Sequence, residues 1–371
     1  MVLMNDFQAE PAEIRDAMLE AAARVLDSGR YVLGGEVEAF ERQWAALCGV
    51  AHGVGVGNGM DAIEIALRAL DIGPGDEVVV PSMTAFATVL AVMRAGAEPV
   101  LADIERESAL LSLDSARRCL SSRTRAVLLV HLYGQLRNMQ AWVDLCAEHG
   151  LALVEDCAQA HMASWQHRVA GSFGLAGAYS FYPTKNLGAP GDGGMLVSND
   201  QSVAERARQL RNYGQSARYE HMELGLNSRL DEIQAAILSR RLKWLTAFTR
   251  RRRQIAEAYR AQLTNPAVEL LGPAQELEAH VNHLFVVTCE ERDRLQAHLQ
   301  SCGVQTSIHY PVAIHCEKPC AGLARDRKGL ANSERHARTC LSLPCHPQMT
   351  EEQVDAVVAA VNCFAACGDW A

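Results

Sequence analysis

Residues 178–194 read Ala-Tyr-Ser-Phe-Tyr-Pro-Thr-Lys-Asn-Leu-Gly-Ala-Pro-Gly-Asp-Gly-Gly, and an apolar run over 195–197 follows them. The residues before Pro183 predict a short strand, and the glycine-rich segment after the lysine leads into another strand. Lys185 therefore lies in a turn between two extended segments. A single lysine in such a turn is either an ordinary solvated charge or an amine that forms a Schiff base with an aldehyde cofactor.

A second stretch, upstream of this turn, favours the cofactor role. Residues 154–161 read Val-Glu-Asp-Cys-Ala-Gln-Ala-His, and we interpret their start as a buried strand that ends in acidic residues. A carboxylate in that position, such as Asp156, can pair with the protonated ring nitrogen of pyridoxal phosphate (PLP). The two stretches together predict Lys185 and Asp156 as the catalytic residues of a PLP enzyme.

Strands and helices alternate at short intervals before this pair. Strands are expected at 78–81, 99–103, 126–132 and 151–155, and helices at 82–96, 112–119 and 139–149. This alternation is typical of an α/β fold with a mainly parallel sheet flanked by helices, in which ligands bind beyond the carboxyl ends of the strands. Because Ser82, Asp156 and the Lys185 turn all follow such ends, the pattern predicts one shared crevice.

A glycine-rich turn precedes another expected helix. Residues 53–61 read Gly-Val-Gly-Val-Gly-Asn-Gly-Met-Asp. A dinucleotide fingerprint needs a third glycine where this chain has Asn58 or Met60, so that interpretation fails. The simpler interpretation is a helix N-terminus at which the backbone N–H groups of Gly59, Met60 and Asp61 hold a phosphate.

The C-terminal part of the chain has a different pattern. Strands are expected at 283–288 and 304–308, with a helix at 292–301 between them and a terminal helix over 351–367. We therefore expect two domains. The first is a large PLP-binding domain with an N-terminal helical segment over residues 1–250, and the second is a smaller C-terminal α+β domain over residues 251–371.

Three motifs, in this order, resemble the DegT/StrS-type sugar-nucleotide aminotransferases, which are fold-type I PLP enzymes with an aspartate-aminotransferase-like fold. They are Asp-Cys-Ala-Gln-Ala-His at 156–161, Ser-Phe-Tyr-Pro-Thr-Lys-Asn-Leu-Gly at 180–188 and Gly-Leu-Asn-Ser-Arg-Leu-Asp-Glu-Ile-Gln-Ala-Ala at 225–236. The likeness begins near Phe7 and extends to Pro347, so it covers nearly the whole chain.

The resemblance assigns roles to individual residues. Lys185 holds the cofactor and acts as base and acid, while Asp156 pairs with the ring nitrogen. Ser180 hydrogen-bonds the cofactor phosphate, and Gln159 lies beside the ring. In a homodimer with shared active sites, Asn227 reaches the phosphate of the other subunit. The implied cofactor-binding residues are Gly59, Met60, Asp61, Phe86, Asp156, Gln159, Ser180, Lys185 and Asn227.

Some of these assignments have alternatives. Family members carry an aromatic residue directly after the threonine at 84, but this chain has Ala85 there. Phe86, the next residue, is either the side chain that stacks on the ring or a core residue of the following helix. The residues that the resemblance places near the sugar are Tyr31, His309, Tyr310 and His315. For Tyr31, His309 and His315, a purely structural role is an equally good interpretation as contact with the sugar.

The implied activity is the transfer of an amino group from an amino acid, with L-glutamate expected, to a keto group of a nucleotide-linked deoxy sugar. Segments 57–62, 219–221 and 227–231 are more similar to members that act at sugar C3, which favours a dTDP-3-keto-6-deoxyhexose. A 4-keto-sugar aminotransferase is the alternative within the family. The related sugar dehydratase replaces Lys185 by histidine, which argues against it. A noncatalytic regulatory protein on the PLP fold is the remaining alternative, because Ala85 departs from the family pattern.

The overall composition excludes other classes. The chain has 371 residues and a formal net charge of −9, so we expect no nucleic-acid partner and no anionic membrane surface. The N-terminus lacks a basic region followed by an apolar core, and no apolar run approaches the roughly 20 residues of a membrane span. We therefore expect a cytoplasmic protein without a membrane partner.

Two unusual sets of residues have simple explanations. The chain has twelve cysteines, but the pairs at 316/320, 340/345 and 363/367 lack the two-residue spacing of a zinc knuckle. We expect free thiols and no metal. Four consecutive arginines at 250–253 lie within an expected helix and predict a solvated face.

Overall fold

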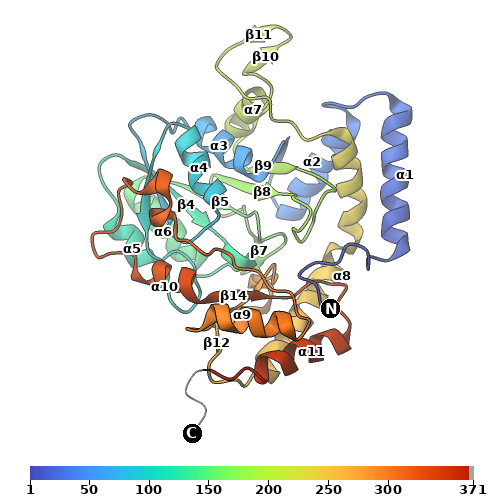
Figure 1. Ribbon diagram of the computed structural model, residues 1–371. Coiled ribbons are helices and arrows are strands. Elements are labelled where there is room, and N and C mark those ends of the chain that lie inside the picture. The colour runs from blue at the N-terminus through green and yellow to red at the C-terminus, as the bar shows by residue number, and fades with distance from the viewer. Residues whose placement is uncertain (367–371) are drawn as a thin grey trace.

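Seven strands form the central sheet of the computed structural model, which describes residues 1–366 (Figure 1). In their order across the sheet they are β1 (His52–Val56), β9 (Gly194–Ser198), β8 (Ala176–Ser180), β5 (Ala152–Asp156), β4 (Thr124–Val130), β2 (Glu77–Pro81) and β3 (Glu98–Ala102). Strand β9 runs antiparallel to β1 and β8, and the remaining neighbours are parallel. The predicted mainly parallel sheet is confirmed.

Helices cover both faces of this sheet, because consecutive side chains of a strand point to opposite faces. In β2, Val78 and Val80 belong to the apolar cluster formed with α3 and α4, whereas Val79 belongs to the cluster formed with α2 and α6. The helices of this part of the chain are α1 (Ala12–Ser28), α2 (Gly35–Cys48), α3 (Gly59–Ala69), α4 (Phe86–Arg94), α5 (Leu113–Arg118), α6 (Met139–His149), α7 (Gln201–Leu210) and α8 (Glu232–Gln262).

The long helix α8 leads from this sheet to a second group of elements, which we call the C-terminal unit (residues 269–366; Figure 1). Its sheet has three antiparallel strands, and the N-terminal residue Val2 pairs with Val304 beside it. The elements of the unit are β12 (Glu269–Leu270), β13 (Phe285–Thr288), β14 (Cys340–Leu343), α9 (Arg292–Ser301), α10 (Ala331–Thr339) and α11 (Glu351–Asn362).

A hairpin projects from the body of the molecule at the top of Figure 1. It consists of β10 (Gln215–Ala217) and β11 (Glu220–His221). Three residues in the hairpin and just after it are strongly exposed to solvent: Tyr219 by 79%, Met222 by 71% and Leu224 by 88% of their surface. The remaining short elements are β6 (Ser164–Trp165), β7 (Arg168–Val169), η1 (Leu132–Gly134), η2 (Leu277–Ala279), η3 (Ile314–Cys316) and η4 (Lys318–Cys320).

Some local predictions were wrong. Residues 304–308 form isolated bridges to Val2 and Ser342 in place of a strand. The terminal helix ends at Asn362, and Cys367 lies outside the described residues. The arginine run is not a uniformly solvated face, because Arg252 is buried and its guanidinium donates to the backbone carbonyls of His283 and Cys345.

Two properties of the described residues bear on the composition arguments. The eleven cysteines of residues 1–366 are free thiols, as predicted. Over the same residues, no helix combines the length and the apolar character that crossing a bilayer would require.

Candidate active site

The C-terminal ends of β5 and β8 meet the N-terminus of α3 at one edge of the sheet. Asp156 ends β5 and Ser180 ends β8, while α3 begins at Gly59. A Cβ atom added to Gly59 would lie 2.7 Å from the Cβ of Ser180, so glycine is required for this close approach. The predicted crevice therefore brings a carboxylate, a hydroxyl and a helix N-terminus together.

The first turn of α3 presents two backbone donors. Asn58 caps the helix, because its side-chain oxygen accepts from the N–H of Asp61 at 2.8 Å. The Asp61 carboxylate in turn accepts from the hydroxyl of Ser228 at 2.7 Å. Since the N–H of Asp61 is occupied, the donors that remain for a phosphate are those of Gly59 and Met60.

Lys185 lies in the turn after β8, where its backbone N–H donates to the carbonyl of Tyr182 at 2.9 Å. Burial lowers the pKa of its amine to about 8, and the negative charge of Asp156 acts in the opposite direction. The chain has four lysines, and the other three, Lys243, Lys318 and Lys328, are exposed. Lys185 is thus the lysine whose amine is most available as a neutral nucleophile near neutral pH.

The Asp156 carboxylate is 6% exposed and has one hydrogen bond to each oxygen. The hydroxyl of Thr88 donates to Oδ2 at 2.8 Å, and the N–H of Ala158 donates to Oδ1 at 3.0 Å. Each carboxylate oxygen can accept more than one bond, so capacity remains for a ring N–H. Thr88 was missed by the sequence analysis, because its contact with Asp156 spans 68 positions.

Gln159 connects this edge to the C-terminal unit. Its side-chain oxygen accepts from the N–H of Tyr133 at 2.6 Å, and its amide nitrogen donates to the hydroxyl of Tyr310 at 3.3 Å. Burial raises the pKa of Tyr310 to about 12, with a further contribution from the charge of Asp156. The Tyr310 phenol therefore stays protonated at neutral pH, and the Gln159 amide is held from both sides.

The two histidines that were predicted to lie near the sugar differ in their available atoms. The Nδ1 atom of His309 lies 2.8 Å from the hydroxyl of Ser342. Burial lowers the pKa of His309 to about 4, and the charge of Lys185 lowers it further, so the ring is neutral at pH 7. His315 uses both ring nitrogens, at 2.7 Å from the Ser82 hydroxyl and 3.1 Å from the Glu334 carboxylate. His309 keeps a ring nitrogen for a ligand, whereas His315 bridges two parts of the protein.

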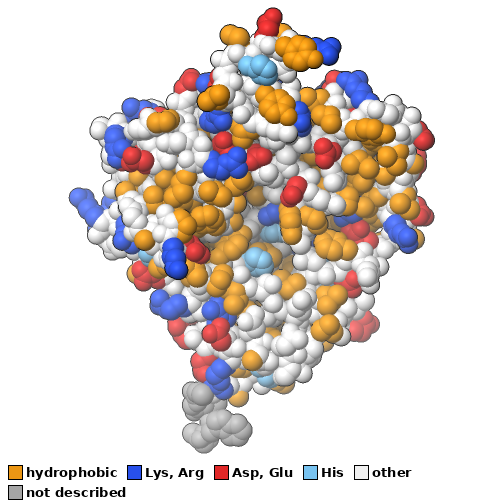
Figure 2. Space-filling view, turned by 45° about the horizontal axis from the view of Figure 1, so that its top comes forward, with side chains coloured by type: hydrophobic (Ala, Val, Ile, Leu, Met, Phe, Trp, Pro, Cys, Tyr) orange, Lys and Arg blue, Asp and Glu red, His pale blue; other side chains and the backbone are white. Residues whose placement is uncertain are grey.

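A cavity of about 270 Å³ lies beside the Lys185 turn. His283 lines it, and its Nδ1 lies 3.1 Å from the side-chain oxygen of Asn186. The Asn186 amide nitrogen donates to the carbonyl of Val281, so His283 is the donor in its own bond. Figure 2 shows histidine side chains in a hollow near the middle of one face, with hydrophobic side chains around it. The cavity is lined by Met4, Asn5, Tyr182, Thr184, His283, Leu284, Ser307, His309, Leu343 and Cys345.

His161 was part of the motif but had no assigned role. Its Nε2 donates to the carbonyl of Ser180 at 2.9 Å, and its ring lies among those of Trp44, Tyr179 and Phe181. Burial lowers its pKa to about 3, so it is neutral at pH 7. His161 therefore helps to hold the backbone of Ser180, the last residue of β8, in place.

Three other predicted residues contact different parts of the single chain. Tyr31 is 52% exposed, and its carbonyl accepts from the N–H of Glu232 at 3.2 Å. Asn227 is exposed and pairs with Asn212. Phe86 is half-buried and packs against the apolar cluster of α3 and α4. Their proposed contacts with a cofactor, a sugar or a second subunit stay predictions.

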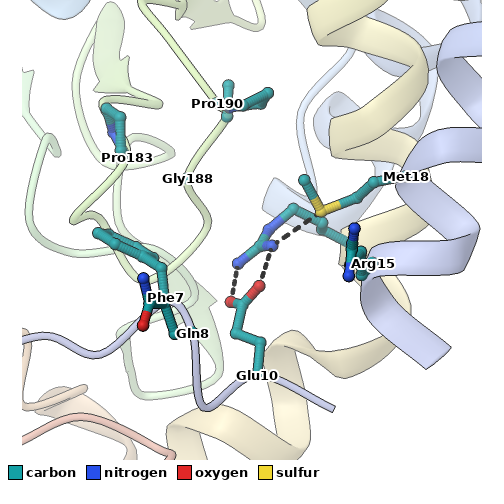
Figure 3. Close-up of a pocket in the computed structure, with 10 residues that line it drawn as sticks. Phe7, Gln8, Glu10, Arg15, Met18, Pro183, Gly188 and Pro190 are labelled. Atoms are coloured by element: carbon teal, nitrogen blue, oxygen red, sulfur yellow. Dashed lines mark hydrogen bonds and ion pairs between the residues drawn. The ribbon is translucent and has the colours of Figure 1, made fainter. Parts of the chain in front are cut away.

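A larger cavity of about 550 Å³ is lined in part by Pro183 and by Gly188–Pro190 of the loop that carries Lys185 (Figure 3). Its walls come from the N-terminal segment at Phe7, from α1 and α8, and from the loop at Gly188. Within it, Arg241 of α8 forms a two-pronged ion pair with Glu10 at 2.9 and 2.6 Å. This ion pair fixes the N-terminal segment next to the turn.

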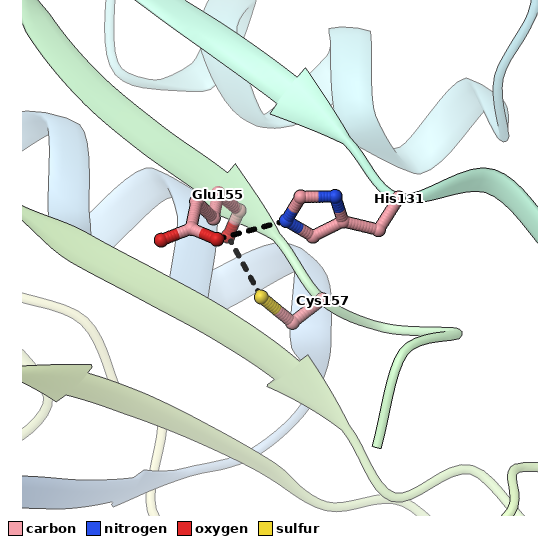
Figure 4. Close-up of side chains that lie close together, drawn as sticks. All are labelled: His131, Glu155 and Cys157. Carbon is pink, nitrogen blue, oxygen red and sulfur yellow. Dashed lines mark hydrogen bonds and ion pairs between the residues drawn. The ribbon is translucent and has the colours of Figure 1, made fainter. Parts of the chain in front are cut away.

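One group of side chains has the composition of a metal site. His131, Glu155 and Cys157 offer ligand atoms within 4.8 Å of one another (Figure 4). The Glu155 carboxylate, however, already accepts from His131 and from the backbone N–H groups of Gly171, Phe173 and Gly174, each at 2.8 Å. Burial also raises the pKa of the Cys157 thiol well above its usual value. The carboxylate therefore anchors a turn and has no free position for an ion.

Comparison with known proteins identifies the architecture. The model of the DegT/DnrJ/EryC1/StrS aminotransferase family matches residues 12–362. The crystal structure of DesV from S. venezuelae in complex with a ketimine intermediate superposes with a TM-score of 0.94 and 45% identity, over 97% of each chain.

Two curated relatives cover nearly the whole chain. The dTDP-3-amino-3,4,6-trideoxy-alpha-D-glucose transaminase of Streptomyces venezuelae is 46% identical over 358 residues, which are 96% of this chain and 94% of the relative. A pleiotropic regulatory protein of Geobacillus stearothermophilus is 39% identical over 365 residues, or 98% of both chains.

The lowered pKa of Lys185 predicts how fast its amine reacts with an aldehyde. We expect borohydride-trapped attachment of pyridoxal phosphate at Lys185 to become faster with rising pH, with a midpoint near 8, because the neutral amine is the nucleophile. Peptide mapping by mass spectrometry separates Lys185 from the three exposed lysines, which serve as internal controls. Attachment at Lys185 that keeps rising toward the ordinary lysine pKa of about 10.4 would contradict the prediction.

Proposed function

Because the chain belongs to the DegT/DnrJ/EryC1/StrS aminotransferase family, whose cofactor is pyridoxal phosphate, we propose that it transfers an amino group to a keto group of a nucleotide-linked deoxy sugar. The observation that carries this proposal is the Lys185 amine of lowered pKa within the field of Asp156. The amino donor is an amino acid, with L-glutamate expected.

The residues at the sheet edge fit the cofactor. Pyridoxal phosphate supplies an aldehyde that binds amines and a ring that accepts electrons. Lys185 would hold the aldehyde carbon, and Asp156 would keep the ring nitrogen protonated. The N–H groups of Gly59 and Met60, with the Ser180 hydroxyl, would bind the phosphate, since the helix N-terminus favours an anion.

Lys185 also moves protons. As a free amine, Lys185 would act as a base that takes a proton from the α-carbon of the amino donor, and as an acid that gives a proton back. The same two roles would serve in the opposite direction for the keto sugar. A pKa of about 8 suits both directions, because a base that is also a good acid works best near the pH of the reaction.

The substrate assigned here is a dTDP-linked 3-keto-6-deoxyhexose. Support comes from the Streptomyces venezuelae transaminase, whose name gives an amino group at sugar C3, and from the C3-like segments of the sequence. His309 and Tyr310 are the side chains assigned to the sugar, because His309 lines a cavity together with Tyr182 and Thr184 of the Lys185 turn, and the Tyr310 hydroxyl accepts from Gln159. A 4-keto sugar is the alternative within the family.

The functional unit proposed here is a homodimer with shared active sites. Its support is the exposed apolar surface of the hairpin region, together with exposed Tyr31 and Asn227. Apolar side chains this exposed are typical of a contact surface.

The proposed boundary between the large domain (1–250) and the small domain (251–371) falls within α8. This helix contacts α1 and α2 of the first part and α11 of the C-terminal unit.

A regulatory protein that binds PLP without catalysis is the second candidate, because the Geobacillus stearothermophilus relative is named as a regulatory protein and Ala85 departs from the family pattern. The two candidates differ in their response to an amino donor. Loss of the visible absorption of the bound cofactor on addition of L-glutamate would support the aminotransferase, whereas an unchanged spectrum would support the regulatory protein.

The position of amination can be read from products. We expect the enzyme with L-glutamate to form an amino sugar from a dTDP-3-keto-6-deoxyhexose and not from its 4-keto isomer, with mass spectrometry and NMR of the product as the measurement. Product from the 4-keto compound alone would overturn the assignment to C3 and leave the aminotransferase activity standing.

Removing the charge of Asp156 should abolish most of the activity. We expect Asp156→Asn to lower kcat by roughly 100-fold to 1,000-fold, because the buried ring cation loses its partner. Asp144→Asn, at an exposed position of α6, is the control and should stay within about twofold. Steady-state kinetics at matched cofactor occupancy makes the comparison, and an Asp156→Asn variant with more than a tenth of the wild-type kcat would contradict it.

The shared site predicts complementation between two inactive variants. Random pairing of Lys185→Ala with Asn227→Ala chains should restore roughly a quarter of wild-type activity, because half the dimers are mixed and each then has one intact site. Pairing Lys185→Ala with Asp156→Asn is the control, since both residues belong to the same chain's cluster, and it should restore nothing. Equal activity in the two mixtures would argue against a site shared between subunits.

A further inference from the structure

Tyr133 lies in η1, shortly after the end of β4, and has an unusual backbone conformation. Its φ angle is +62°, a left-handed value that is costly for a bulky residue, and its side chain is 2% exposed. Both backbone polar groups are bonded, the N–H to the Gln159 side chain at 2.6 Å and the carbonyl to the N–H of His283 at 3.1 Å. The surroundings therefore hold Tyr133 in this conformation between the main sheet and the C-terminal unit.

The Tyr133 hydroxyl also connects to the C-terminal unit. It donates to the backbone carbonyl of His309 at 2.5 Å and lies 2.8 Å from Nε2 of His336. A carbonyl can only accept, so the phenolic proton goes to His309 and His336 donates to the phenolic oxygen. Burial lowers the pKa of His336 to about 4, which keeps this ring neutral at pH 7.

These hydrogen bonds form a closed ring of contacts in the candidate active site. The Tyr133 N–H holds the oxygen of the Gln159 amide, and the nitrogen of that amide holds the Tyr310 hydroxyl. Tyr310 follows His309 in the chain, and the His309 carbonyl accepts from the Tyr133 hydroxyl, which completes the ring of contacts. One tyrosine thus contacts the residue assigned to the cofactor ring and the segment assigned to the sugar.

We propose that Tyr133 is a positioning residue, which fixes the distance between Gln159 on the cofactor side and the His309–Tyr310 segment on the sugar side. This inference rests on the proposed function for the roles of those residues. A keto sugar must reach the cofactor with its carbonyl carbon close to the transferred nitrogen, and small displacements are costly in such a step. The Tyr133 hydroxyl supplies this alignment without touching the substrate.

Tyr133→Phe removes the hydroxyl and keeps the ring. We expect amide hydrogen exchange of residues 307–310 to become about tenfold faster, since the buried bond from the hydroxyl to the His309 carbonyl is lost together with the bond from His336. The second-order rate constant of the keto-sugar half-reaction should fall by about tenfold, while that of the amino-donor half-reaction stays within about twofold. The two half-reactions are followed separately by stopped-flow absorbance of the bound cofactor.

Tyr259→Phe is the matched control. Tyr259 is also fully buried, and its hydroxyl donates to the backbone carbonyl of Pro344 at 2.8 Å in the C-terminal unit. It therefore loses the same kind of bond away from Gln159. We expect both variants to lose thermal stability, but normal exchange over 307–310 and an equal effect on both half-reactions in Tyr259→Phe.

The inference is overturned if the two variants behave alike, or if exchange changes in Tyr133→Phe without a selective loss of the keto-sugar half-reaction. Should the wild-type enzyme aminate no keto sugar at all, the proposed function fails by itself. The exchange data then decide the structural claim alone: faster exchange confined to Tyr133→Phe supports the coupling, and equal exchange in the two variants rejects it.

Discussion

The opposing effects of burial and of the Asp156 charge on the Lys185 amine are the constraint on which the site depends. Burial disfavours the ammonium form, whereas the nearby carboxylate favours it, and the resulting pKa is about 8. Burial without the carboxylate would lower the value further, and a solvated amine would stay protonated throughout the physiological range. A group that attacks a carbonyl and also carries protons needs the intermediate value.

The surrounding structure holds the two groups in place from different directions. The parallel strands bring the ends of β5 and β8 to the same edge, and Thr88 of α4 fixes the Asp156 carboxylate. The residue after the lysine, Asn186, is tied to the C-terminal unit through the carbonyl of Val281 and the ring of His283. The first sheet and the segment that leads into β13 therefore both contribute to the geometry of a single turn.

Local sequence patterns were sufficient for the parallel sheet and for the motifs around Lys185, because strand alternation and turn residues act over a few positions. They were insufficient wherever a side chain's partner is distant in sequence. The buried Arg252 donates to carbonyls that lie 31 and 93 positions further along the chain. The ring of His315 is hydrogen-bonded to Ser82, which is 233 positions away in the sequence. The backbone angle of Tyr133 likewise depends on Gln159 and on the C-terminal unit. Periodicity carries no information about such contacts.

The C-terminal unit also completes the first sheet. The N–H of Leu101 in the edge strand β3 donates to the carbonyl of Ala324, and the Leu101 carbonyl accepts from the N–H of Asp326. The Asp326 carboxylate then pairs with Arg118 of α5 at 2.6 Å. The backbone groups of Leu101 on the outer side of β3 are thus paired within the chain, and breaking these bonds would leave them unpaired at the edge of the sheet. These bonds and the hydrogen bonds of Tyr133 join the same two parts, so contacts within the folded chain hold the C-terminal unit against the edge of the sheet that carries Asp156.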